Sequence, residues 1–429
     1  MEIFKNVNKE SWKALISRPT IDKNDLVKKV QSILDNVKQN GDEALKSYAK
    51  QFDNVNLSEI LVSKSEIDSA NQLVSEELKQ AIRLAKQNIE KFHNSQFRNE
   101  AVIETTKGVR CWRKSVGIEK VGLYIPGGSA PLFSTVLMLG IPAVLANCKE
   151  IVLCTPSNEK GEINPAILYT ANLVGIKKVY KVGGAQAISA MAFGTETIPQ
   201  TYKIFGPGNQ FVTKAKELVQ QNGVAIDMPA GPSEVLIIAD KTGNPSYIAA
   251  DLLSQAEHGA DSQVILLSDN ESILNQTLIE LEKQIVELPK CEIAKKALLN
   301  SKAVLLNNIE DCIAFSNLYA PEHLIIASES APAYIDGIVN AGSVFLGNYS
   351  CESAGDYASG TNHTLPTNGY AKNYSGVSLE SFQKKITFQQ ISKTGIQAIG
   401  PSIEIMAEAE ELFAHKNAVT LRLKDITNV

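Results

Sequence analysis

VGLYIPGG, at residues 121–128, is a short apolar run that ends in proline and glycine. Further runs of this kind follow along the chain, and each is ended by Gly, Pro or Asn. They are EIVLCTP (150–156), KKVYKVGG (177–184), YKIFGPGN (202–209) and VAIDMPAG (224–231). Helical stretches lie between them, such as FVTKAKELVQQ at 211–221. Strands that alternate with helices predict βαβ units and a mainly parallel sheet.

A second series of apolar runs predicts a second α/β sheet. Its members are EVLIIAD (234–240), SQVILLS (262–268), KAVLLN (302–307), HLIIAS (323–328) and GSVFLGN (342–348). We expect the first series, near 121–231, to be an inserted compact block. The first quarter of the chain is expected to be helical, with a helix over 25–41 that stops at a glycine and a capping box formed by Ser63 and Glu66. The tail at 401–416 is expected to be one helix.

The composition is that of a globular protein with more than one domain. At 429 residues the chain exceeds the size at which one hydrophobic core usually stops growing. There are 42 basic and 47 acidic residues, a formal net charge of -5, and no long basic run. This balance argues against nucleic acid and against an anionic membrane surface as partners.

Targeting and redox signals favour the cytoplasm. The start, MEIFKNVNKESW, lacks the basic-then-apolar pattern of a signal peptide. The most apolar stretch, at 136–148, is short and interrupted by Gly140 and Pro142, so it is a poor membrane span. Six cysteines are scattered without a CxxC pair, which argues against a disulfide framework or a thiolate zinc site.

Only five histidines occur, and most of them lie in locally unusual surroundings. A helix is expected to begin at Asn244–Pro245 and to end at Gly259, with proline first and glycine last. In SQAEHGAD (254–261), Gln255 and His258 are three residues apart, so they share one face of the last turn of this helix. A metal site is one interpretation. The other is an ordinary histidine attracted to the negative end of a helix dipole.

Two polar segments offer further candidates. In APEHLIIAS (320–328), Glu322 and His323 stand where a loop leads into a strand, and a carboxylate beside an imidazole suits acid–base chemistry. The stretch 351–369 holds Asp356 and His363 in what we expect to be a loop. Loops carry function disproportionately, but a solvated polar loop is the alternative.

A nucleotide-binding pattern occurs in incomplete form at YKIFGPGNQF (202–211). It supplies a strand, Gly-x-Gly and a helix start, and Asp227 lies at the offset of a ribose-binding acid. Phe211 stands where a third glycine belongs, so the fingerprint is broken. No phosphate-binding P-loop pattern is present, which excludes phosphoryl transfer on such a loop.

The remaining histidines have plain alternatives. His415 lies in the tail with Glu411 one turn before it and Glu410 five residues before, which is also what a solvated acidic helix would show. On a straight helix Glu411, not Glu410, shares a face with His415. His93, in IEKFHNSQ, is expected at the surface or at a helix cap.

Taken together, these segments resemble the histidinol dehydrogenase family, zinc enzymes that finish histidine biosynthesis. The matching stretches run in order from about residue 121 to the C-terminus, and the helical N-terminal region also fits. They are GLYIPGGSAPLFSTVLMLGIPA, VGGAQAISAMAFGT, FGPGNQFV, DMPAGPSEVLIIAD, LLSQAEHGADSQ, YAPEHL, GDYASGTNHTLPT and FAHKNAVTLRL.

The resemblance implies an α/β fold with two incomplete Rossmann-like domains of mainly parallel sheet, a helical N-terminal segment and a C-terminal helical tail. The domain boundaries that we expect are a helical segment at 1–24, a larger α/β domain at 25–120 and 232–375 with the zinc and catalytic residues, an inserted NAD-binding domain at 121–231, and a tail at 376–429 exchanged between subunits.

The resemblance also assigns roles to residues. Zinc, one ion per subunit, would be held by Gln255, His258, Asp356 and His415. Glu322 and His323 would be the catalytic pair in a four-electron oxidation of L-histidinol to L-histidine through the aldehyde, with two NAD used in turn. His323 would take the alcohol proton and Glu322 would activate water.

The other expected contacts also come from the resemblance. The substrate would touch the four zinc-binding residues, the catalytic histidine, and Ser233, His363 and Glu410. NAD would contact Tyr124, Gln186 and Asn209. Members of the family are homodimers, so Glu410 and His415 of one subunit would be part of the active site of the other subunit.

Three alternatives stay open. A related zinc- and NAD-dependent dehydrogenase could oxidise another small amino or diol alcohol, although Glu410 and His363 favour the imidazole of histidinol. A hydrolase could use zinc-bound water with Glu322 as base, but it would not explain two α/β sheets with a nucleotide-like loop. A non-catalytic metal-binding protein would not need Glu322 and His323.

Overall fold

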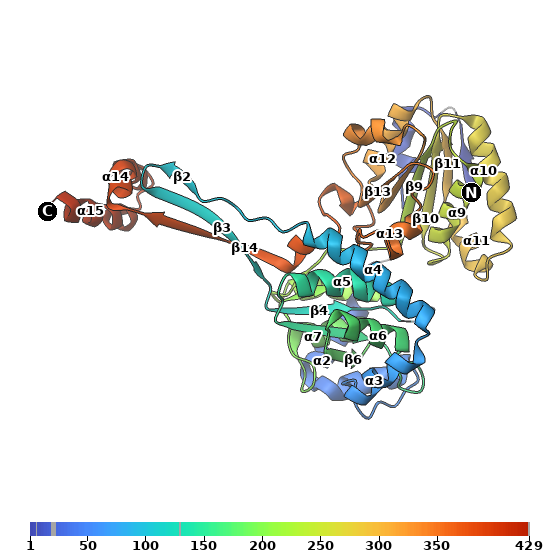
Figure 1. The fold of residues 1–429 in the computed structure, drawn as a ribbon, viewed down its shortest axis with the longest axis horizontal. Coiled ribbons are helices and arrows are strands. Elements are labelled where there is room, and N and C mark those ends of the chain that lie inside the picture. The colour runs from blue at the N-terminus through green and yellow to red at the C-terminus, as the bar shows by residue number, and fades with distance from the viewer. Residues whose placement is uncertain (6, 19–22, 128–129, 428–429) are drawn as a thin grey trace. The chain divides into compact units, whose positions relative to one another are not determined.

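The computed structural model describes residues 1–5, 7–18, 23–127 and 130–427. The chain divides into two compact units, the first made of residues 1–95 and 118–382 and the second of 96–117 and 383–429 (Figure 1). The first unit contains two parallel sheets, each with its own helices and hydrophobic core.

One sheet of the first unit has five strands in the order β6-β5-β4-β7-β8, and all neighbours are parallel. Its strands are β4 (Lys120–Tyr124), β5 (Glu150–Thr155), β6 (Lys178–Lys181), β7 (Lys203–Phe205) and β8 (Ala225–Ile226). The connecting helices are α5 (Phe133–Leu145), α6 (Pro165–Val174), α7 (Gly184–Phe193) and α8 (Gln210–Gln220). When the strands are numbered 1 to 5 in chain order, from β4 to β8, they lie across the sheet in the order 3-2-1-4-5. This is the arrangement of an incomplete Rossmann-like sheet.

The N-terminal helices pack against this five-stranded sheet's helices: α2 against α7 and α8, α3 against α6, and α4 against α5. They are α2 (Lys23–Phe52), α3 (Lys64–Leu73) and α4 (Glu76–Asn94). We expected residues 25–120 to group with 232–375, whereas the apolar face of α4, with Ile82 and Ile89, is buried in the core around β4 and α5. Hydrophobic spacing predicts such a face but not the sheet that covers it.

Local details of these helices were predicted well, with one error. Ser63 and Glu66 form the expected capping box at the start of α3. Gly41 interrupts helical geometry in α2, with φ of 48°, but the chain resumes a helix after it. The expectation for His93 was wrong, because this side chain is fully buried and its Nδ1 lies 2.9 Å from the carbonyl oxygen of Ile89.

The other sheet of the first unit has six parallel strands in the order β1-β11-β10-β9-β12-β13. They are β1 (Glu2–Phe4), β9 (Glu234–Ala239), β10 (Gln263–Ser268), β11 (Lys302–Leu305), β12 (His323–Ala327) and β13 (Ser343–Leu346). Its α-helices are α1 (Trp12–Leu15), α9 (Pro245–Ala256), α10 (Glu271–Ile285), α11 (Cys291–Leu299), α12 (Ile309–Tyr319) and α13 (Glu352–Tyr357). The strand β1 was not predicted. When the other five strands are numbered in chain order, from β9 to β13, they again lie in the order 3-2-1-4-5. The predicted α/β fold with two mainly parallel sheets is confirmed.

Four short 3₁₀ helices complete the first unit, at Lys9–Ser11, Ala331–Gly337, Tyr370–Lys372 and Leu379–Phe382. Throughout the described ranges, no helix is both long and apolar enough to cross a membrane.

The second unit combines a three-stranded antiparallel sheet with two helices. The sheet has the order β14-β3-β2, with β2 (Ile103–Thr106), β3 (Val109–Gly117) and β14 (Gln383–Ile391), and the helices are α14 (Lys393–Ala409) and α15 (Phe413–Thr427). The tail therefore contains a nine-residue strand that we did not predict. The single helix expected over 401–416 was also wrong, because the chain leaves helical geometry between α14 and α15, where Glu411 has φ of 59°.

Candidate active site

Two catalytic candidates stand at the amino end of the central strands of the six-stranded sheet. His323 is the first residue of β12 and Glu322 precedes it. Both side chains are buried, with 4% and 7% of their surface exposed. Glu234, the first residue of the neighbouring strand β9, lies beside them.

Hydrogen bonds to the main chain of Glu234 orient both side chains. The N–H of Glu234 donates to Glu322 Oε2 at 2.9 Å, and His323 Nδ1 lies 3.2 Å from the carbonyl oxygen of Glu234. Because a carbonyl only accepts, we assign the proton to Nδ1. The ring's other nitrogen, Nε2, is buried without a hydrogen-bond partner in the described part of the chain and faces Asp356 Oδ1 at 3.6 Å. Nε2 is therefore the atom that can gain or lose a proton.

Gln255 reaches the same point from α9. Asn244 caps the start of this helix and Pro245 occupies its first turn, as the sequence predicted. Gln255 is 1% exposed. Its amide nitrogen donates to Glu322 Oε2 at 3.4 Å and lies beside His323. The expectation that His258 shares the last helical turn was wrong, because α9 ends at Ala256 and His258 follows it in an exposed bend.

A short helix brings two carboxylates to the site. Residues 352–357 form α13, whereas we expected a loop over 351–369. Glu352 and Asp356 are four residues apart and so lie on one face of this helix. Glu352 is 1% exposed, and its Oε1 lies 3.8 Å from His323 Nδ1. We did not predict Glu352, although the spacing of the two acids in CESAGDY would have indicated it had the segment been recognised as helical.

The close carboxylates perturb proton affinities. Burial by itself lowers the pKa of His323, but the negative charges of Glu352, Glu322 and Asp356 outweigh it and raise that pKa to about 10. Burial raises the pKa of Glu322 to about 8, against the attraction of His323. Burial likewise raises the pKa of Glu352 to about 8. Perturbations of this kind, in a site with several carboxylates around one imidazole, are typical of functional centres.

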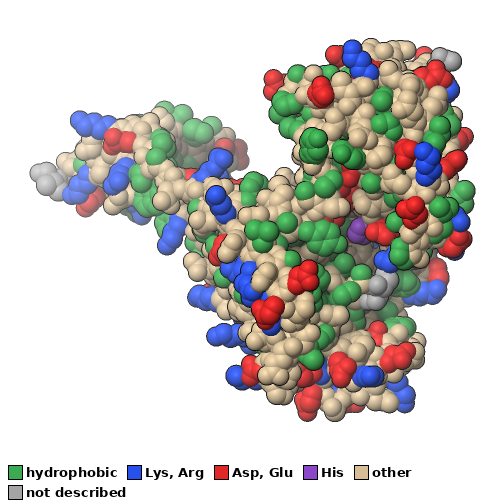
Figure 2. All heavy atoms as spheres, turned by 45° about the vertical axis from the view of Figure 1, so that its right-hand side comes forward, with side chains coloured by type: hydrophobic (Ala, Val, Ile, Leu, Met, Phe, Trp, Pro, Cys, Tyr) green, Lys and Arg blue, Asp and Glu red, His purple; other side chains and the backbone are tan. Residues whose placement is uncertain are grey.

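Three of these side chains could hold a metal ion. Ligand atoms of His258, Glu352 and Asp356 all lie within 4.8 Å of one another. Within the described residues, the buried Oε2 of Glu352 has no hydrogen-bond partner. One imidazole nitrogen and carboxylate oxygens form a donor set that suits zinc. In Figure 2 a histidine side chain is visible in a hollow of the first unit, beside acidic side chains.

Two of the expected substrate contacts also belong to the first unit. His363 Nδ1 lies 2.9 Å from the carbonyl oxygen of Asp356, and its Nε2 lies 3.1 Å from the hydroxyl of Thr135 on α5. Ser233 directly precedes β9. The other two expected residues, Glu410 and His415, belong to the second unit, where both are exposed and where the break after α14 separates them.

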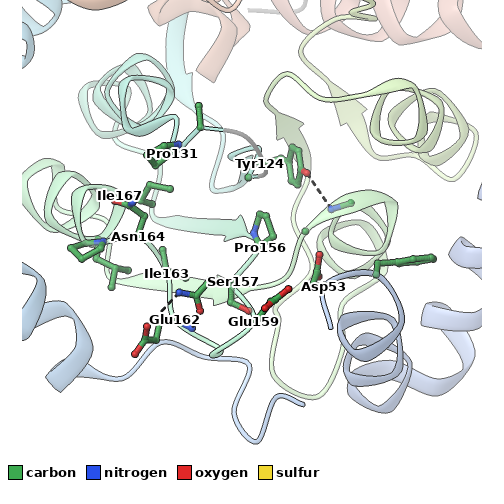
Figure 3. A pocket seen from close by; sticks show the side chains of 18 of the residues that line it. Asp53, Tyr124, Pro131, Pro156, Ser157, Glu159, Glu162, Ile163, Asn164 and Ile167 are labelled. Atoms are coloured by element: carbon green, nitrogen blue, oxygen red, sulfur yellow. Dashed lines mark hydrogen bonds between the residues drawn. The ribbon is translucent and has the colours of Figure 1, made fainter. Parts of the chain in front are cut away.

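The residues expected to contact NAD all line a cavity of about 1080 Å³ at the carboxyl edge of the five-stranded sheet (Figure 3). Tyr124 ends β4, and its hydroxyl accepts a hydrogen bond from the N–H of Gly184 at 3.1 Å. Gln186 lies on α7. Asn209 caps α8, with its side-chain oxygen accepting from the N–H groups of Phe211 and Val212.

The glycine loop after β7 is built differently from a dinucleotide fingerprint. Gly206 has φ of 130°, and a Cβ there would meet the carbonyl oxygen of Tyr124 at 2.1 Å. Asp227, at the offset of a ribose-binding acid, is instead buried in an ion pair with Lys216 and accepts from the N–H of Gly206 at 2.8 Å. Its carboxylate therefore holds the loop and is not free for a ribose.

The fold and the site define a two-sheet α/β protein with a buried acid–base pair, a group of potential metal ligands and a separate large cavity. The family model of histidinol dehydrogenase matches residues 16–423. Histidinol dehydrogenases of Bacteroides thetaiotaomicron and Bacteroides fragilis are 56% and 55% identical over 426 residues, which is 99% of this chain and 100% of each relative. The crystal structure of histidinol dehydrogenase from Elizabethkingia anophelis superposes with a TM-score of 0.98 at 65% identity and covers 100% of this chain and 99% of that one. The chain belongs to the histidinol dehydrogenase family and is an NAD-dependent oxidoreductase.

Proposed function

We propose that the chain oxidises L-histidinol to L-histidine in two steps, with histidinaldehyde between them and one NAD reduced in each. The observation that carries this proposal is the buried pair Glu322 and His323 beside the potential ligands His258 and Asp356. The family membership supplies the substrate and the oxidant.

Zinc is the metal that these residues fit. Its ligands in our proposal are Gln255, His258, Asp356 and His415, and the carboxylate of Glu352 faces the same point. When bound, zinc would supply positive charge that holds the alcohol and amine of the substrate and lowers the pKa of nearby groups.

In the first step His323 acts as the base. Its Nδ1 faces the Glu234 carbonyl, so Nε2 takes the proton of the substrate hydroxyl while the hydride of the same carbon leaves to NAD. The alcohol carbon loses two electrons and becomes an aldehyde. His323 must be neutral to act in this way, and the surrounding carboxylates oppose that by raising its pKa until positive charge enters the site.

In the second step Glu322 acts on water. Its carboxylate takes a proton from a water molecule as the water oxygen attacks the aldehyde carbon. The former carbonyl oxygen takes up the proton that His323 gained in the first step, which yields the hydrate and leaves His323 neutral. His323 then removes a hydroxyl proton of the hydrate while the hydride leaves to the second NAD, and the product is the carboxylic acid. The raised pKa of Glu322, about 8, is compatible with a carboxylate that exchanges protons near neutral pH.

Binding roles follow from the same proposal. Ser233, His363 and Glu410 would contact the substrate. Tyr124, Gln186 and Asn209 would contact NAD, and their common position in the large cavity supports this. Buried apolar walls with a few polar groups are usual in cofactor sites.

We further propose a homodimer in which Glu410 and His415 complete the site of the other subunit. In the second unit α15 has no buried side chain among its described residues, and Phe413 and Leu421 are 60% and 58% exposed. An apolar surface of this kind marks an interface. All six cysteines are described by the structure and each is free, which supports a reducing, cytoplasmic location.

The test follows NADH absorbance after addition of histidinol, zinc and NAD. We expect two NADH for each histidinol consumed. A reaction with another amino or diol alcohol, but not with histidinol, would favour the related dehydrogenase instead. Elemental analysis of His258→Asn should show loss of zinc and of activity with the fold retained, and full zinc occupancy in that variant would contradict the ligand assignment.

The division of labour has its own test. Glu322→Gln should retain the first, water-free oxidation better than the second, whereas His323→Asn should impair both. Histidinaldehyde supplied separately allows the two steps to be compared. Equal losses in both steps for Glu322→Gln would argue against separate roles for the two side chains.

Shared sites can be tested by mixing. His258→Asn and His415→Asn proteins, each inactive alone, should regain activity after mild denaturation and joint refolding. In a heterodimer one site receives both damaged groups and the other receives neither. No recovery with heterodimers present would mean that each chain completes its own site.

A further inference from the structure

In the described structure Glu234 is the one residue whose main chain hydrogen-bonds to the side chains of both catalytic candidates. Its N–H donates to Glu322 Oε2 at 2.9 Å, and its carbonyl oxygen lies 3.2 Å from His323 Nδ1. The position of this single peptide segment therefore sets where the carboxylate points and which ring nitrogen of His323 stays free.

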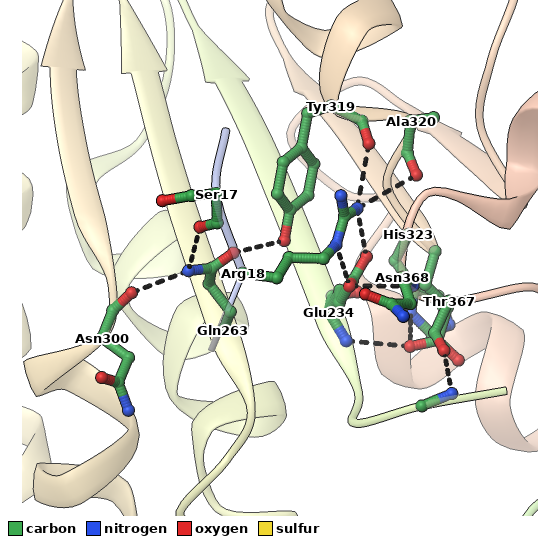
Figure 4. Close-up of polar contacts among 12 residues, drawn as sticks. Ser17, Arg18, Glu234, Gln263, Asn300, Tyr319, Ala320, His323, Thr367 and Asn368 are labelled. Atoms are coloured by element: carbon green, nitrogen blue, oxygen red, sulfur yellow. Dashed lines mark hydrogen bonds and ion pairs between the residues drawn. The ribbon is translucent and has the colours of Figure 1, made fainter. Parts of the chain in front are cut away.

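The side chain of Glu234 is held from two directions, and it is buried. Arg18 donates from Nε to Oε1 and from Nη2 to Oε2, the latter at 2.8 Å. The N–H of Asn368 also donates to Oε1, at 2.9 Å. Figure 4 shows these contacts converging on Glu234 from separate parts of the chain. A two-pronged guanidinium–carboxylate contact fixes geometry more strictly than a single hydrogen bond does.

Arg18 is itself fixed. Its Nη2 donates to the carbonyl oxygen of Tyr319 at 2.9 Å, and the guanidinium lies 3.9 Å from the centre of the Tyr319 ring. The Tyr319 hydroxyl in turn donates to Gln263 at 2.9 Å. This chain of contacts ties Arg18 to the end of α12, so Glu234 cannot shift without disturbing several buried groups.

Stability alone is a poor explanation for this arrangement. A buried ion pair recovers little more than the cost of removing two charges from water, and an apolar pair of the same size is often as stable. Fixed orientation is what such a pair provides, and here the orientation is that of the residue bonded to both Glu322 and His323.

We propose that Arg18 and Glu234 are positioning residues for the oxidation: Arg18 clamps the Glu234 side chain so that the Glu234 main chain holds Glu322 and the Nδ1–H of His323 in place. This inference rests on the proposed function, because the proposed function gives Glu322 and His323 their roles. Arg18 and Glu234 take up no proton in the proposed steps and act through Glu322 and His323.

The experiment compares four proteins, the wild type and three variants, as full-length, zinc-loaded enzymes. Arg18→Met removes the guanidinium and keeps an unbranched side chain. Arg18→Lys keeps the charge but not the two-pronged contact. Ser301→Ala is the matched control, because it removes buried hydrogen bonds to Val264 and Ala297 beside the same sheet and touches neither Arg18 nor Glu234. Steady-state kcat and KM, zinc content and melting temperature are measured for each.

We expect Arg18→Met to lower kcat by about 10- to 100-fold, the usual cost of losing a group that orients a catalytic residue. Its KM for histidinol and NAD and its zinc content should stay near those of the wild type, because no ligand contact is lost. Arg18→Lys should restore part of kcat. Ser301→Ala should melt at a lower temperature yet keep the kcat of the wild type. If Arg18→Met fails to fold, Glu234→Gln, which keeps the contact from Asn368, replaces it with the same expectation.

An unchanged kcat in Arg18→Met overturns the inference. So does an equal loss of kcat in Ser301→Ala at an equal fall in melting temperature, because the effect would then be one of stability. Failure of the wild type to reduce NAD with histidinol overturns the proposed function, and the inference with it. If the wild type is active with histidinol and Arg18→Met is fully active as well, the inference about Arg18 and Glu234 is overturned and the proposed function stands.

Discussion

Apart from β1, the two parallel sheets of the first unit share the strand order 3-2-1-4-5, but their candidate functional residues lie at opposite ends of the strands. In the five-stranded sheet the cavity lies where the strands end: Tyr124 closes β4, and Asn209 follows β7. In the six-stranded sheet the acid–base pair, Glu322 and His323, lies where β12 begins, beside the start of β9 at Glu234. Ligands in open α/β sheets usually bind beyond the carboxyl ends of the central strands, so only the first sheet follows the rule.

The helices explain how the second sheet differs. A helix that follows a parallel strand runs back toward the strand's beginning, so the C-terminal end of α9 places Gln255 and His258 near the start of β12. The last short helix, α13, adds Glu352 and Asp356 there. In our proposal the same topology therefore builds a cofactor site from the loops after the strands of one sheet, and a catalytic centre from helix ends and strand starts of the other.

The largest expected effect comes from His323→Asn, at the start of β12. Loss of a general base should lower turnover by about 10²- to 10⁴-fold, because an amide in its place cannot take up the alcohol proton. NAD binding, measured by calorimetry, should be unchanged because the cavity belongs to the other sheet. A comparable loss of NAD affinity would show that the two edges do not act separately.

A smaller loss is expected for Glu352→Gln, which tests the carboxylate that only the structure revealed. Removing its charge from the potential metal ligands should weaken zinc binding by about 10- to 100-fold, as measured by competition with a chelator. Glu271→Gln is the control, since Glu271 pairs with Lys5 at the surface of the same sheet's helices. Equal zinc affinity in both variants would remove Glu352 from the metal centre.

Asn209→Ala should affect the carboxyl edge of the five-stranded sheet. It removes the cap of α8 and one polar group of the cavity. We expect KM for NAD to rise by about 3- to 10-fold, the equivalent of one hydrogen bond, with zinc content unchanged. A normal KM for NAD would exclude Asn209 from the cofactor site.

The smallest effect is expected for Asn244→Ala, at the equivalent edge of the six-stranded sheet. Asn244 caps α9 as Asn209 caps α8, accepting from the N–H of Ser246 at 3.0 Å. Its loss should lower the free energy of unfolding by about 1 kcal/mol in denaturant titration. Neither KM for NAD nor zinc content should change, and a change in KM for NAD would place a ligand at this edge after all.

Patterns only a few residues long were enough to predict most of the helices and strands. Strand runs ended by Gly or Pro, the capping box at Ser63 and Glu66, and the Asn244–Pro245 helix start all came from such patterns. The motifs around Gln255, His258, Glu322 and His323 also identified the family. Such signals can be recognised in the sequence because residues that are close together in the chain also lie close together within one helix or strand.

Contacts between residues that are far apart in the chain determined which helices and strands share a hydrophobic core and which side chains contact one another. The sheet that covers α4, the burial of His93, and the clamp between Arg18 and Glu234 depend on residues far apart in the chain, 216 positions in the last case. The break at Glu411 and the helix that aligns Glu352 with Asp356 were also missed. Short-range preferences at such places are weak, and the balance is decided by burial and charge pairing that exist only after the chain has folded.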